Sequence, residues 1–164
     1  MVDTSDLLLV LGALVIFALV TLNINTMLAT NTANLTTNEL DYEGVAVGQN
    51  VIDEARVLAF DESCTNGNSP SNIPQDFSNS SNFGGASEGE AYPHFDDFDD
   101  YNGYSRTDTT THGVYTISAR VMYVETANPE TNAGHKTRNK RMNVTVTSPY
   151  LDHDITLYFI RSYY

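Results

Sequence analysis

The strongest constraint in this chain is the apolar run Leu7–Leu22, "LLLVLGALVIFALVTL", within a stretch that carries no charged residue between Asp6 and Glu39. At 1.5 Å per residue, this run together with 23–29 reaches roughly 35 Å as a helix, enough to cross a bilayer. We therefore predict a transmembrane or filament-core helix over 1–29. Acids stand before the run, where an anchor usually shows Lys or Arg, and the first cation is Arg56. Either the membrane orientation is weakly specified, or a basic leader is removed.

A second helical segment is predicted over 30–63. Its apolar residues recur at steps of three and four and form one narrow face: Gly44, Val47, Val51, Ala55 and Leu58. A helix from Thr4 to about Phe60 would be on the order of 85 Å long and needs partners along its length. Gly44 and Gly48 permit close approach, either of another helix or of a sheet.

The rest of the chain divides into a connection and a sheet. Residues 64–112 are rich in Ser, Asn, Gly and Pro, which predicts a long loop, either disordered or fixed to the core by Phe77, Phe83, Tyr92 and Phe95. From Gly113 the apolar pattern alternates, and 113–164 is predicted to form three antiparallel strands. The inward sets are Tyr115, Ile117, Ala119, Val121 and Tyr123; Met142, Val144 and Val146; Ile155, Leu157 and Phe159.

These elements predict an α+β fold. One face of the sheet must be covered, and the second half of the long helix has the only suitable apolar face. We therefore expect that half to pack on a small antiparallel sheet, while the apolar first half projects.

Composition excludes several classes of function. The chain has 21 acidic and 8 basic residues, a net charge of −13, which repels nucleic acids and anionic headgroups. There is no phosphate loop, nucleophile elbow, dinucleotide fingerprint or paired-histidine zinc motif, so we expect neither an enzyme nor a protein that needs an organic cofactor. Cys64 stands alone and is either an inert side chain or a site of intermolecular crosslinking.

Three stretches, "VIDEARVLAFDE", "FDDFDDYNGY" and "KRMNVTVTSPYL" leading into "FIRSYY", together with the layout above, resemble the type IV pilin superfamily. The resemblance implies that a leader is cleaved before Met1. It also implies that an acid near the mature N-terminus neutralises the α-amino group of a neighbouring subunit. Ser5 occupies the position where the family usually has Glu, so Asp6, or else Asp3, takes that role here. The alternative is an ordinary helix start, with Asp3 or Thr4 capping amides and Asp6 favoured by the helix dipole in the first turn, and both roles can coexist.

The function expected from this resemblance is that of a structural subunit of an extracellular helical filament made of identical chains. The subunit would pass through the inner membrane as a precursor and reach the cell surface by assembly. The alternative is a membrane-anchored minor pilin or pseudopilin of a secretion or adhesion machine.

The stretch "FDDFDDYNGY" offers the hard oxygen ligands of Asp96, Asp97, Asp99, Asp100 and Asn102, which suit calcium. The other interpretation is a structural turn, in which aspartates bind backbone amides and Asn102-Gly103 supplies a positive φ, while Phe95, Phe98 and Tyr101 fix the turn to the core.

Two further surface features have open alternatives. The basic cluster Lys136–Arg141 is either a solvated loop or a partner for the acidic turn of a neighbouring subunit. Three sequons, at Asn34, Asn79 and Asn143, permit glycosylation.

Overall fold

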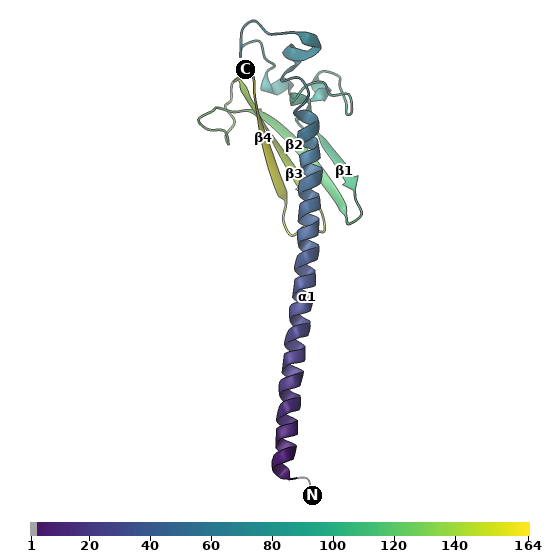
Figure 1. The fold of residues 1–164 in the computed structure, drawn as a ribbon. Helices are drawn as coiled ribbons and strands as arrows, with labels where there is room; N and C mark the ends of the chain where they lie inside the picture. Colours follow the sequence, from purple (N-terminus) through teal and green to yellow (C-terminus); the bar gives the residue numbers. More distant parts are fainter. Residues whose placement is uncertain (1–2) are drawn as a thin grey trace. The chain divides into compact units, whose positions relative to one another are not determined.

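A computed structural model describes residues 3–164, which form two compact units divided between Glu39 and Leu40. The helix α1 (Thr4–Ala55) contributes 4–39 to the first unit and 40–55 to the second (Figure 1). The two segments predicted over 1–29 and 30–63 thus belong to one helix. It ends at Ala55, several residues before the predicted end. Arg161 donates to the carbonyl oxygen of Ala55, an acceptor that a helix end leaves free, and to those of Leu58 and Ala59 in the segment that follows.

The first unit is a helix whose side chains are exposed on every side. All residues from Thr4 to Thr36 are exposed, including the large apolar side chains between Leu7 and Leu28. This part of α1 is long and apolar enough to cross a membrane. It is therefore compatible with a transmembrane helix.

The second unit contains a four-stranded antiparallel sheet in the order β1-β2-β3-β4 (Figure 1). The strands are β1 (Ser105–Thr109), β2 (Val114–Tyr123), β3 (Asn139–Thr147) and β4 (Ile155–Ser162). The sequence predicts only the last three. The edge strand β1, "SRTDT", lies in the predicted loop and pairs with β2 from Ser105↔Ser118 to Thr109↔Val114. It has no apolar side chain, so hydrophobic alternation cannot reveal it.

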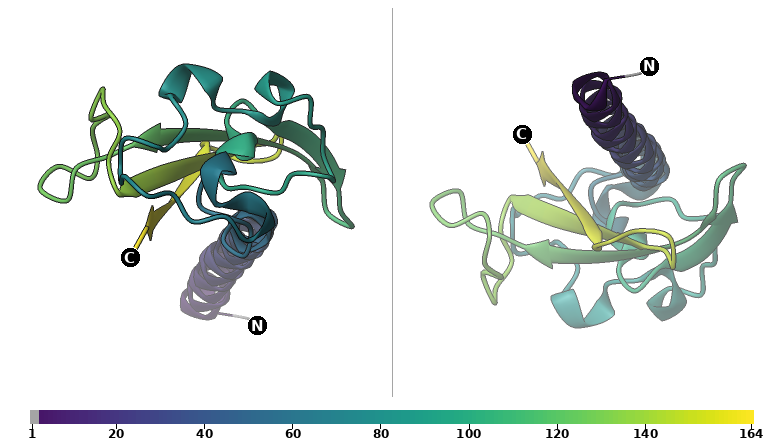
Figure 2. Two further views of the ribbon diagram at one scale, coloured as in Figure 1. Left: turned by 90° about the horizontal axis from the view of Figure 1, so that it is seen from above. Right: turned by 90° about the horizontal axis from the view of Figure 1, so that it is seen from below.

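The core lies between the sheet and residues 40–55 of α1, as the helical and alternating patterns predict. Val51 and Ala55 are fully buried against the sheet residues Tyr115, Ile117 and Val144. The α+β fold class is confirmed, and the arrangement is compatible with a pilin-like fold. Figure 2 shows the strands of this sheet from two opposite directions.

Two glycines permit the close contact between helix and sheet. A Cβ at Gly44 would lie 2.6 Å from Ile155 Cδ1, and one at Gly48 would lie 2.9 Å from both Leu157 Cδ1 and Val146 Cγ2. Of the two uses predicted for these glycines, the structure therefore bears out the close approach to the sheet.

The segment between α1 and β1 is built from short helical turns and buried rings. It contains η1 (Glu62–Gly67), η2 (Ser80–Asn82), η3 (Gly85–Ser87) and η4 (Asp99–Tyr101). Phe77 and Phe83 are buried, whereas Tyr92 is 44% exposed. In Figure 1 these turns gather at the end of the sheet where α1 and β4 end. The long loop thus has a defined path, and three of its four predicted aromatic contacts belong to the core or pack against it.

Candidate functional site

The acidic turn (residues 95–104) is an ordered structural element in which backbone amides bind two of the aspartates. Asp97 Oδ1 accepts hydrogen bonds from the amides of Asp99 and Asp100, at 2.8 and 3.1 Å. Asp100 Oδ2 accepts in turn from the amides of Asp96 and Asp97, at 3.2 and 3.1 Å. Each carboxylate is thereby fixed by one oxygen, and its other oxygen is left free of hydrogen bonds.

The turn closes through Asn102 and Gly103. Gly103 has φ +83°, Asn102 has φ −70° and ψ 117°, and the Tyr104 amide donates to the Tyr101 carbonyl oxygen at 3.1 Å. These values describe a type II turn, which requires a positive φ at its third residue. The predicted positive φ is therefore found at Gly103 alone. The Asn102 side chain accepts from the Val121 amide at 3.1 Å and contacts the Phe83 carbonyl oxygen, so it fixes the turn to the sheet.

Lys140 is the buried counterion of this turn. Its position in β3 faces the core in phase with Met142, and its side chain is 0% exposed. The ammonium donates to Asp61 Oδ2 at 2.7 Å, to the Phe60 carbonyl oxygen at 2.9 Å and to Asp99 Oδ1. It also lies 4.7–5.5 Å from the ring centroids of Phe60, Phe83 and Tyr123. The basic cluster that contains Lys140 had two alternatives, a solvated loop or a partner for the acidic turn of a neighbouring subunit, but Lys140 is buried and pairs inside its own chain.

Among the described residues, four aspartates are buried near this one buried ammonium, Asp61, Asp97, Asp99 and Asp100, and Lys140 binds Asp61 and Asp99 only. Burial raises the pKa of Asp61, but Lys140 and hydrogen bonds from Ser63 and Ser78 outweigh it, and the pKa is lowered overall. Burial and the Asp99 charge raise the pKa of Asp97 to about 9, and burial raises that of Asp99 to about 6 despite Lys140. Negative charge is therefore in excess around the turn.

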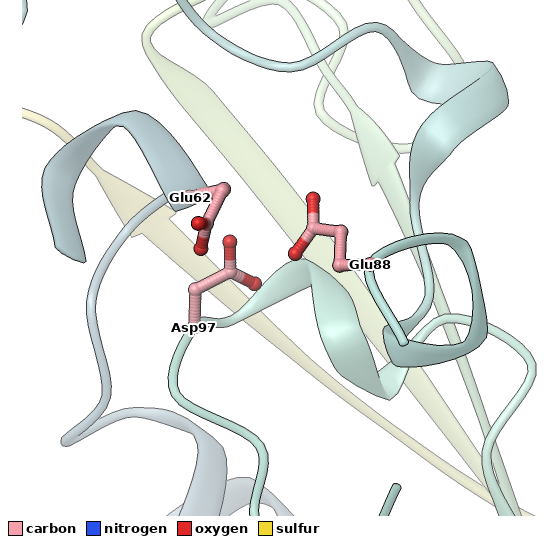
Figure 3. Close-up of side chains that lie close together, drawn as sticks. All are labelled: Glu62, Glu88 and Asp97. Carbon is pink, nitrogen blue, oxygen red and sulfur yellow. The ribbon is translucent and has the colours of Figure 1, made fainter. Parts of the chain in front are cut away.

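The free carboxylate oxygens converge in two groups. The first group, called the Asp97 triad, consists of Glu62, Glu88 and Asp97. The second, called the Asp100 triad, consists of Glu90, Asp96 and Asp100. In each triad every residue offers one carboxylate oxygen, and the three oxygens lie within 4.8 Å of one another. Figure 3 shows the carboxyl groups of the Asp97 triad pointing toward one another from three separate segments.

The predicted ligand set is therefore only partly brought together. Asp96, Asp97 and Asp100 enter the triads, whereas Asp99 binds Lys140 and Asn102 binds the backbone. Sequence reasoning missed the three glutamates, which come from outside the turn and have no local signal. It also missed Lys140, although the alternation of β3 places it on the inward face.

The other predicted site residues lie on the surface or outside the described part. Asp3 and Asp6 flank the start of α1, where the amides of Asp6 and Leu7 donate to the Asp3 carbonyl oxygen at 3.1 and 3.2 Å. Within residues 3–164 neither of these two carboxylates has a recorded hydrogen bond. Met1 lies outside the described residues.

The predicted sequons differ in their accessibility. Asn34 in α1 and Asn79 before η2 are exposed. Asn143 is half-buried within β3, and its Oδ1 accepts from Arg141 Nε at 2.7 Å.

No protein-family profile matches this chain, and no curated protein or solved structure shows significant similarity to it.

Proposed function

We propose that this chain is a pilin-like structural subunit that enters a membrane through the first half of α1 and then assembles with identical chains into an extracellular helical filament. The observation that carries this proposal is the length of exposed helix without charge. It runs from Leu7 to Asn38, about 48 Å at 1.5 Å per residue, whereas the hydrocarbon core of a bilayer is about 30 Å thick. A bilayer alone does not account for the excess, whereas a bundle of like helices does.

The polar residues of this stretch support the same conclusion. The hydroxyl groups of Thr21, Thr26, Thr30, Thr32 and Thr36 all donate to carbonyl oxygens of the preceding turn of their own helix. A hydroxyl satisfied in this way does not need water, so it can be buried against another helix at low cost. Heterologous contacts between such helices that do not close into a ring produce a filament.

The start of α1 supplies the specific contact. Asp3 and Asp6 are the only charged side chains of the chain before Glu39, and the first cationic side chain is Arg56. An unpaired carboxylate in a dry helix bundle costs several kcal/mol. As the resemblance to pilins implies, the α-amino group of a neighbouring mature subunit pairs with it there.

Electron microscopy of material sheared from cells tests the proposal. We expect filaments containing the chain as a major component, and fewer or slower-forming filaments from Asp6→Asn. The matched control, Asp152→Asn, removes an exposed charge from the β3–β4 connection and should assemble normally. Monomer confined to membranes, or a substoichiometric presence in an envelope complex, would contradict the filament and favour the anchored minor subunit. Normal assembly of the double variant Asp3→Asn, Asp6→Asn would contradict the proposed pair.

A further inference from the structure

The Asp97 triad is arranged around a buried oxygen that has no partner. Asp97 is 0% exposed, and its Oδ1 is held by two backbone amides. Its Oδ2 is also buried and accepts no hydrogen bond from any described residue. A buried carboxylate oxygen left in this state costs free energy unless it meets a proton or a cation. In Figure 3 the two groups that face it are the carboxyl groups of Glu62 and Glu88, which add negative charge.

The Asp100 triad shows the same feature independently. Asp100 is 2% exposed and its Oδ2 is held by two amides, while its Oδ1 is buried without a partner. Glu90 Oε2 and Asp96 Oδ1 are buried and unpartnered as well. Three carboxyl groups that each lack a partner for one buried oxygen therefore meet at one place.

We propose that the two triads bind hard divalent cations of the Ca²⁺ class, which join η1 and residues 88–90 to the acidic turn. The spacing is suitable, because two oxygens bound to one Ca²⁺ at about 2.5 Å lie at most about 5 Å apart, and the oxygens of each triad lie within 4.8 Å. The ligand type is suitable too, since carboxylates on irregular segments match the flexible coordination of Ca²⁺ better than the strict octahedron of Mg²⁺. The exposed side of the Asp97 triad leaves room for water ligands.

Lys140 does not take the place of such a cation. Its ammonium already binds Asp61, Asp99 and the Phe60 carbonyl oxygen, which uses all three of its hydrogens. The cationic side chain of Arg161, which also lies near Asp97, donates to the carbonyl oxygens of Ala55, Leu58 and Ala59. A bound divalent cation would therefore neutralise charge that these two side chains leave uncompensated. This inference does not depend on the proposed assembly, because all six carboxylates lie within residues 40–164.

Calcium titration of the full chain in non-ionic detergent tests the proposal, after removal of metals with a chelator. Thermal unfolding and isothermal calorimetry provide the readouts. A site as weak as those of extracellular modules, with Kd of about 0.1 mM, would by itself give a Tm rise of roughly 5–10 °C at about 10 mM Ca²⁺, and two such sites about twice that rise. We expect a smaller rise with Mg²⁺ and none with NaCl at equal ionic strength.

Conservative variants locate the sites. Glu88→Gln for the Asp97 triad and Glu90→Gln for the Asp100 triad remove one ligand charge each and avoid the buried aspartates that shape the turn. Each should weaken the corresponding binding step about 10-fold or more, because Ca²⁺ affinity depends on the number of charged ligands. Glu130→Gln is the matched control, since Glu130 is exposed and remote in sequence from both triads. A variant that leaves Ca²⁺ affinity unchanged removes its triad from the proposal. A Tm insensitive to Ca²⁺, or a rise equal in all three variants and the parent chain, overturns it altogether.

Discussion

Replacing Lys140 with methionine is the most direct test of how the second unit is held together. Methionine has a similar length and suits an apolar site, so the change removes the charge with little change of volume. The ammonium is completely buried and makes its hydrogen bonds to Asp61, Asp99 and the Phe60 carbonyl oxygen. In the variant all three acceptors lose their donor, and two buried carboxyl groups lose their counterion.

The expected loss of stability follows from the burial of the partners. Removing one member of a buried ion pair typically costs about 3–5 kcal/mol, because the other charge remains buried and uncompensated. Asp99 can limit this cost by taking up a proton, since burial already raises its pKa to about 6. Asp61 loses the Lys140 charge, the main cause of its lowered pKa, and keeps only the hydrogen bonds from Ser63 and Ser78 against its burial. We therefore expect a loss of about 3 kcal/mol at neutral pH, a large share of the 5–15 kcal/mol that usually stabilises a domain.

Urea unfolding of the full chain in non-ionic detergent, followed by near-ultraviolet circular dichroism of its tyrosines, measures this loss. The control is Lys136→Met, because that ammonium makes one exposed hydrogen bond, to the Gln75 carbonyl oxygen. It should change the free energy of unfolding by no more than about 0.5 kcal/mol. In the double variant Lys140→Met, Asp99→Asn the loss should be smaller than the sum of the two single losses. A loss below about 1 kcal/mol for Lys140→Met would refute the assignment of Lys140 as the counterion of the turn.

Two further outcomes are expected from the acidic turn. Gly103→Val should destabilise the second unit by about 1–2 kcal/mol or more, because φ is +83° there, while Gly103→Asn should cost less. No atom lies within 4 Å of a Cβ at Gly103, so equal unfolding midpoints for both variants would contradict a conformational cause. In chelator, the free energy of unfolding should fall as pH rises from about 5 to 9. Asp97 keeps its proton to about pH 9 in the folded chain but loses it near 3.8 in the unfolded chain, so this group alone contributes a slope of about 1.4 kcal/mol per pH unit. The raised pKa values of Asp99, about 6, and Glu88, about 7, steepen the fall at the lower end of the range. Stability that increases over this range would contradict the raised pKa.

The elements with an apolar period could be predicted from the sequence, and those held by polar contacts could not. The inward residues of β2, from Tyr115 to Tyr123, alternate without interruption and are all buried. The edge strand β1 has no such signal, because backbone pairing with β2 defines it. The end of α1 was misplaced for a related reason. The apolar period continues to Leu58, but the helix stops at Ala55, and the carbonyl oxygens beyond it bind Arg161, which is distant in sequence.

The candidate site divides in the same way. The aspartates of the turn are neighbours in sequence, so their proximity was predictable, and so was the positive φ of Gly103. The partner of each aspartate was not predictable, because successive side chains of the turn point in different directions. Asp99 points to Lys140, while Asp97 and Asp100 point to glutamates brought in by η1 and the segment after η3. A lysine at an inward position of a strand was the one available signal, since such a residue is rarely buried without a partner.

The two compact units, divided between Glu39 and Leu40, bury their apolar side chains in different ways. Residues 4–36 expose their side chains on every side, so only lipid or other chains can cover their apolar part. Residues 40–164 bury a hydrophobic core, and the buried Lys140 forms its ion pair within the same unit. We therefore expect Asp6→Asn to change assembly without changing the unfolding of the second unit, and Lys140→Met to do the reverse as long as that unit stays folded. A variant of Asp6 that also lowered the stability of residues 40–164 would mean that the first half of α1 contributes to their packing. The charge-free stretch would then need an explanation other than assembly.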